Sequence, residues 1–104
     1  MSSVTDKDLY GGLIRLHILH HAAKEPIFGL GIIEELRHHG YQLSPGTLYP
    51  MLHGMEKKGY LTSRHVQAGR RSRRVYEITG QGHIALTDAR NRVKELFGEL
   101  VEGK

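Results

Sequence analysis

The chain contains no cysteine and no tryptophan among its 104 residues, and only three prolines. The absence of cysteine excludes disulfide bonds, thiolate metal sites and a cysteine nucleophile. No apolar run approaches the roughly 18 residues that a membrane-spanning helix needs. The N-terminal residues MSSVTDKD also lack the basic and apolar regions of a signal peptide, so the sequence predicts a cytoplasmic protein.

Signatures of catalysis are also missing from the sequence. It has no Gly-x-Ser-x-Gly motif, no glycine-rich phosphate loop and no carboxylate pair beside a candidate base. We therefore expect a protein that is not an enzyme and that needs no cofactor. The length allows a single domain with one hydrophobic core.

Positive charge is concentrated in one third of the chain. Residues 44–78 hold seven Lys/Arg and two Asp/Glu, a net charge of +5, whereas residues 1–43 carry −1 and residues 79–104 are neutral. Neutralisation of phosphates by Lys and Arg supplies most non-specific affinity for DNA. The charge distribution therefore indicates a nucleic-acid contact within residues 44–78.

Apolar periodicity predicts four helices, at residues 6–23, 29–39, 45–58 and 80–101. Ser44 is the expected N-cap of the third helix, with Pro45 at its first position. Gly40 is the expected left-handed end of the second helix, and Thr79 the N-cap of the fourth. Pro50 has no N–H to donate to the carbonyl of Gly46 and is expected to interrupt the third helix near its start.

Two strands are expected between the third and fourth helices, at residues 61–66 and 73–78, joined by a turn at residues 68–72. A helix followed by a basic hairpin is the order of a winged helix-turn-helix, in which the helix enters a groove of DNA and the hairpin flanks it. The sequence thus predicts a mainly α fold with a small two-stranded antiparallel wing. Residues 1–80 would form the DNA-binding domain and residues 81–104 a C-terminal dimerisation helix, packed as one compact unit.

The motifs GTLYPMLHGMEKKGYL and GRRSRRVYEITGQGHIAL resemble the PadR family of bacterial transcriptional regulators, specifically its shorter branch with a single C-terminal helix. The resemblance covers nearly the whole chain. The residues that carry it are Gly46, Thr47, Leu48, Tyr49, Pro50, Met55, Glu56, Gly59, Tyr76, Thr79 and Gly82. It implies a recognition helix, a wing, a dimerisation helix and a role as a repressor.

The face of the third helix opposite its apolar side is expected to approach DNA, and the arginine-dense turn to contact phosphates or the minor groove. Four like charges at a loop tip repel each other, so an anionic partner explains them best. The predicted DNA-binding residues are Ser44, Gly46, Thr47, Tyr49, Pro50, His53, Lys57, Arg64, Arg70, Arg71, Arg73 and Arg74.

The fourth helix has apolar residues separated by three and four positions, the pattern of a helix that pairs with a copy of itself. The first helix is apolar on two sides, which suggests two neighbours. We therefore expect a homodimer that binds a pseudo-palindromic operator in double-stranded DNA. The predicted dimer interface comprises Leu9, Tyr10, Leu13, Leu86, Ala89, Val93, Leu96, Phe97 and Leu100.

Two alternatives remain open from the sequence. The first is a winged-helix module that binds protein partners and not DNA. The second is a sensor of a metal or a small molecule, because His17, His20 and His21 cluster on the first helix and His17 and His21 are one turn apart. No carboxylate of that helix completes a ligand set, so we expect no metal site. A small-molecule effector at the subunit interface is compatible with the sensor and also with the main interpretation, a DNA-binding regulator.

Overall fold

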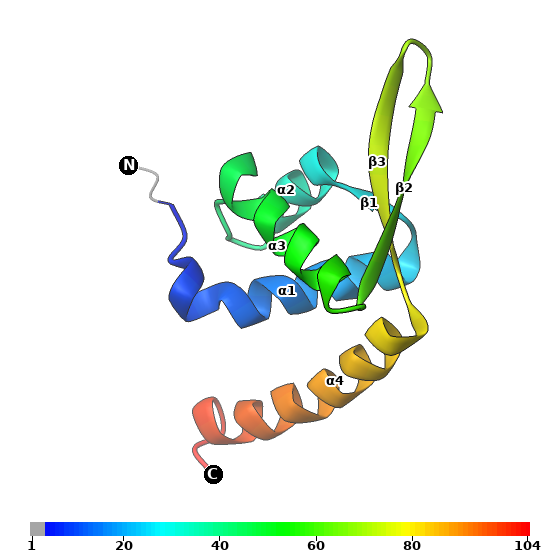
Figure 1. Ribbon diagram of the computed structural model, residues 1–104. Coiled ribbons are helices and arrows are strands. Elements are labelled where there is room, and N and C mark those ends of the chain that lie inside the picture. Colours follow the sequence, from blue (N-terminus) through cyan, green and yellow to red (C-terminus); the bar gives the residue numbers. More distant parts are fainter. Residues whose placement is uncertain (1–3) are drawn as a thin grey trace.

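The computed structural model describes residues 4–104, in which four helices surround the base of a projecting hairpin (Figure 1). None of these helices is long and apolar enough to cross a bilayer. In chain order the elements are α1 (Lys7–Lys24), β1 (Ile27–Phe28), α2 (Gly29–His38), α3 (Pro45–Lys57), β2 (Leu61–Ala68), β3 (Arg71–Ile78) and α4 (Gly80–Leu100).

The starts of α1 and α4 follow local capping rules, whereas no side-chain hydrogen bond caps α2 at Phe28 or α3 at Ser44. The carboxylate of Asp6 accepts the amides of Asp8 and Leu9 at the start of α1, and Thr79 Oγ1 accepts the Gly82 amide at the start of α4. Ser44 does occupy the N-cap of α3. However, the bond that its hydroxyl forms within the described chain is a long one to Thr47 Oγ1, at 3.4 Å, and not one to a backbone amide.

The sheet has three strands, so the prediction of a two-stranded sheet was wrong. β1 pairs antiparallel with β3, and the strand order is β1-β3-β2. A strand of two residues is too short to show an alternating pattern, which is why the sequence did not reveal it. The added strand lies at the base of the hairpin and joins the loop before α2 to the wing.

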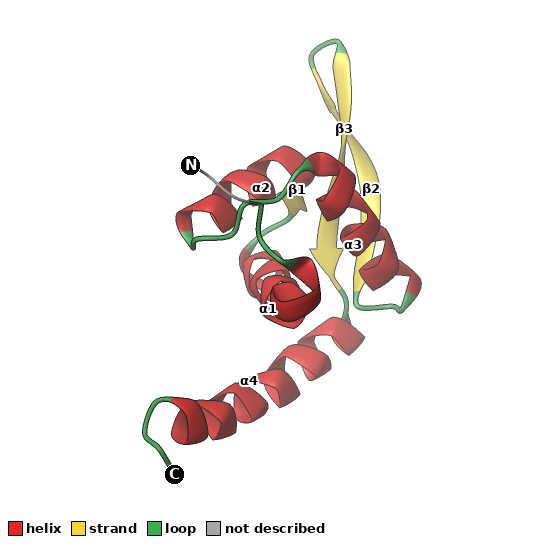
Figure 2. Cartoon of the chain, turned by 90° about the vertical axis from the view of Figure 1, so that its left-hand side faces the viewer, coloured by secondary structure: helices red, strands yellow, loops and turns green. Residues whose placement is uncertain are grey.

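The hairpin of β2 and β3 is longer than predicted. Its pairing runs without interruption from Leu61 opposite Ile78 to Ala68 opposite Arg71. Only Gly69 and Arg70 remain for the turn, and Gly69 has a φ of 64°, a conformation that favours glycine. Figures 1 and 2 show the far half of this hairpin extending well beyond the helices.

The core lies where α1, α2 and α3 meet the base of the hairpin. In Figure 2, α1 is seen nearly end-on with α2 and α3 above it and α4 below. The largest fully buried side chains come from all of these elements except α4: Tyr76, Ile14, Ile18, Leu36, Leu48, Leu52 and Leu61. Figures 1 and 2 both show α3 and the wing on the side of α1 that is away from α4.

α4 packs against α1 but is mostly exposed. Of its 21 residues only Gly82 and Leu86 are buried. Leu86 belongs to the core of its own chain, although the sequence placed it in the dimer interface. The apolar residues nearer the C-terminus of α4 remain accessible.

Candidate DNA-binding surface

The two faces of α3 are those that the periodicity predicted. Leu48, Met51, Leu52 and Met55 are buried, whereas Gly46, Pro50, His53 and Lys57 are exposed. The helix runs through Pro50 without a break, contrary to the expected interruption. The exposed face therefore combines two short residues with an imidazole and an ammonium group.

The start of α3 borders a hollow shared with α1. Thr47, Pro50 and Met51 line it from α3, and two cations that the sequence analysis had not singled out, Lys7 and Arg15, line it from α1. The local pattern of α1 contains no signal for this role, because the proximity to α3 arises only in the folded chain. Asp8 of α1 also lines the hollow, so two cations and one carboxylate border it near the start of α3.

Tyr49 is half-buried, and its ring packs over Gly29 at the start of α2. A side chain at position 29 would overlap the Tyr49 hydroxyl and ring, so glycine is required for this contact. Tyr49 therefore fixes the separation of α2 and α3. Its hydroxyl lies at the N-terminus of α2, near the edge of the exposed face of α3.

The wing carries its arginines on two faces. By the strand register, Arg64, Arg71 and Arg73 share one face, and Arg74 lies on the other. The Arg73 guanidinium lies 4.1 Å from the centre of the Phe28 ring, and Arg64 Nε donates to Glu77 Oε1 at 2.6 Å. The side chains of Arg70 and Arg71 are exposed at the tip and have no ion-pair or hydrogen-bond partner among residues 4–104.

Arg74 belongs to a polar chain that joins the wing to α3. Its Nη1 donates to Ser63 Oγ at 2.8 Å, and Ser63 Oγ donates to Glu56 Oε2 at 2.7 Å. Burial raises the pKa of the Tyr76 hydroxyl, which lies close to these hydrogen-bonded side chains. Glu56 was part of the motif used for the family resemblance, but the sequence did not reveal its link to the wing.

Three histidines meet between α1 and α2. His17 and His21 of α1 lie beside His39, the C-cap residue that follows α2. Burial lowers the pKa of His17, and its histidine neighbours lower it further; burial is also the largest cause of the lowered pKa of His21. The prediction from the sequence took metal ligands only from the first helix. The spacing of Glu35 and His39, four positions apart on the second helix, was the signal that could have extended the set.

An exposed helix and a basic hairpin, held together by a common core, define a winged helix-turn-helix. Residues 18–88 match the model of the transcriptional regulator PadR-like family. The transcriptional regulator Rv3488 of Mycobacterium tuberculosis is 47% identical over 91 residues, which cover 88% of this chain and 85% of that protein.

Solved structures agree with this assignment. A PadR family regulator from Eggerthella lenta superposes with a TM-score of 0.79 at 27% identity, covering 93% of this chain and 88% of the other. A PadR-like factor from Bacteroides fragilis gives 0.80 at 25% identity, covering 94% and 96%. The chain belongs to the PadR-like family of transcriptional regulators. It is a DNA-binding regulator of transcription and not an enzyme.

Proposed function

We propose that the protein is a homodimeric repressor that binds a specific operator and acts in the cytoplasm by occluding a promoter. Each subunit inserts the exposed face of α3 into the major groove, where His53 and Lys57 contact base edges or phosphates. The wing tip lies over the neighbouring minor groove, where Arg70 and Arg71 neutralise phosphates. The pairing of these two surfaces on one side of the core supports this arrangement.

The uncovered apolar face of α4 is the main observation that supports a dimer. Val93, Leu96 and Phe97 are 42%, 41% and 51% exposed, and Leu100 more so. A folded monomer gains nothing from leaving such a stripe in water, and stripes of this kind mark protein interfaces. A second copy supplies an identical stripe in the right orientation for a two-fold contact.

The exposed face of α1 extends the same surface. Leu9, Tyr10 and Leu13 are 69%, 40% and 41% exposed. A groove of about 450 Å³ lies between α1 and α4 on their exposed side. Apolar residues from both helices, including Ala89, form much of its lining. In the proposed dimer the partner's α4 fills this groove. An aromatic effector bound there, against Tyr10 or Phe97, would change the separation of the two recognition helices.

Selection from a random pool of duplex DNA tests the DNA-binding part of this proposal. We expect enrichment of an inverted repeat whose half-sites lie about one helical turn, or a multiple of it, apart. Weak, salt-insensitive retention of DNA without enrichment of any sequence would instead favour a module that binds protein partners. A single, unrepeated half-site would contradict the dimer while leaving DNA binding intact.

The variant Leu96→Glu tests the interface. In a paired α4 it would place one carboxylate from each subunit near the two-fold axis, where both lose water and repel each other. We expect monomers at micromolar concentration by light scattering, together with weaker operator binding. Ile84→Glu is the matched control, because Ile84 is exposed on the opposite face of α4. A folded Leu96→Glu dimer, or a monomeric wild type, would refute the model.

A further inference from the structure

One ring nitrogen from each of His17, His21 and His39 lies within 4.8 Å of the other two. The His17 and His39 rings stack with centroids 4.6 Å apart, and the His21 and His39 centroids are 5.6 Å apart. The rings come from two helices that are distant in sequence. Three imidazoles that converge in this way form the nitrogen set of many transition-metal sites.

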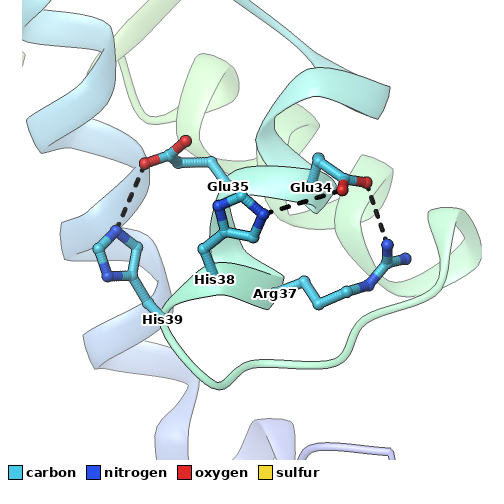
Figure 3. A network of polar contacts seen from close by, with 5 residues as sticks. All are labelled: Glu34, Glu35, Arg37, His38 and His39. Carbon is cyan, nitrogen blue, oxygen red and sulfur yellow. Dashed lines mark hydrogen bonds and ion pairs between the residues drawn. The ribbon is translucent and has the colours of Figure 1, made fainter.

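A carboxylate lies beside two of the three imidazoles. Glu35 Oε1 lies 3.7 Å from His21 Nε2 and 3.5 Å from His39 Nε2. Figure 3 shows Glu35 and His39 beside the ribbon of α1, whereas Arg37 and His38 contact Glu34 farther from that helix. Glu35 is therefore the acid of α2 that reaches the histidine cluster.

The separations of Glu35 Oε1 from the His21 and His39 nitrogens are longer than ordinary hydrogen bonds and close to the spacing of two ligands on one small ion. Two ligands of a tetrahedral Zn²⁺ ion, each about 2.0–2.1 Å from the metal, lie about 3.3–3.4 Å from each other. His21 Nε2 is also buried and forms no hydrogen bond with any described residue. A buried polar atom without a partner is costly, and coordination would supply the missing partner.

We propose that His17, His21, His39 and Glu35 bind one divalent transition-metal ion, with Zn²⁺ as the best match. Imidazole and carboxylate ligands suit this class, whereas Mg²⁺ and Ca²⁺ prefer oxygen ligands alone. The lowered pKa values of His17 and His21 favour the neutral imidazoles that coordination needs. The expectation of no metal site failed to consider ligands from the second helix.

The ion would tie α1 to the end of α2. His39 directly follows α2, and the short segment from Gly40 to Ser44 leads from there into α3. Binding to the folded state alone would raise the unfolding midpoint of the protein with increasing metal concentration. This proposal concerns metal binding itself and does not depend on contact with DNA.

Titration of tag-free protein with Zn²⁺ and Co²⁺ tests the site. We expect one ion per chain, a visible Co²⁺ absorption band of the four-coordinate type, and its loss when Zn²⁺ displaces Co²⁺. His39→Ala and His21→Gln should each weaken Zn²⁺ binding by at least about tenfold, the lower end of what even an outer-shell partner contributes. Glu35→Gln should alter the Co²⁺ band.

His38→Ala is the matched control, because it removes a neighbouring histidine that contacts Glu34 and not the cluster. It should bind Zn²⁺ like wild type. His39 is 41% exposed, so its replacement should leave the fold intact, as circular dichroism would verify. Absence of saturable one-to-one binding by wild type would overturn the proposal. Equal losses in His38→Ala and His39→Ala would overturn it as well.

Discussion

Replacement of Arg70 and Arg71 by alanine is the sharpest test of how the wing works. Both side chains are exposed at the tip and have no polar partner within residues 4–104, so their loss should remove no internal contact. Arg64, Arg73 and Arg74 are each engaged with Glu77, Phe28 or Ser63, and their replacement would disturb the hairpin itself. The double variant therefore separates DNA contact from stability.

The expected effect follows from counterion release. Each phosphate neutralised on duplex DNA contributes about 0.9 to the slope of log K against log salt concentration. Two contacts per subunit, in a dimer, should make the slope of the variant shallower by about 3.6. Because surface substitutions away from internal contacts change the free energy of unfolding by only about 0.5 kcal/mol, urea unfolding should be almost unchanged.

Binding is measured by fluorescence anisotropy on operator and on random duplexes, over a range of salt concentrations. Affinity should fall on both, because phosphate contacts carry no sequence information. The control is Arg92→Ala with Lys104→Ala, which removes the same charge from α4 and the C-terminus, far from the wing in Figure 1. An unchanged slope in the wing variant, or an equal change in the control, would refute the reasoning.

Two further predictions concern α3. His53→Ala and Lys57→Ala should relax operator preference, or weaken operator binding by about 1–3 kcal/mol where a base contact is lost. A competition assay measures this preference. If both variants discriminate like wild type, this face does not read sequence. Gly29→Ala should destabilise the fold by about 1–3 kcal/mol in urea unfolding, because the new methyl group overlaps Tyr49. Gly54→Ala, where a methyl group meets nothing within 4 Å, is its control and should not destabilise.

Much of the fold could be predicted because its signals are local. The spacing of Leu48, Met51, Leu52 and Met55 set the buried side of α3. The residues that cap a helix lie next to it in the sequence. β1 could not be predicted, because two residues gain strand geometry only by pairing with β3. Leu86 shares its periodicity with Leu96, and only packing distinguishes a core residue from an exposed one.

The sequence proposed the candidate DNA-binding residues as one set and could not distinguish their contacts. The sequence grouped the arginines of the hairpin by charge, whereas the structure gives Arg64 and Arg74 internal partners and leaves Arg70 and Arg71 without them. The contacts of Glu56 with Ser63 and of Glu35 with the histidines join separate elements. No pattern within a single element contains that information.

The contacts around α3 also constrain how DNA binding could be regulated. Tyr49 fixes α3 against the start of α2, and the chain from Glu56 through Ser63 to Arg74 fixes its other end against the wing. A change within one subunit that moved α3 alone would break both contacts, so α3 and the wing should move together as one body. α4, by contrast, is held to that body mainly through α1 and the start of its own helix. In the proposed dimer, we therefore expect that any effector would act by rotating whole winged-helix bodies about the α1–α4 surface, which would change the distance between the two recognition helices.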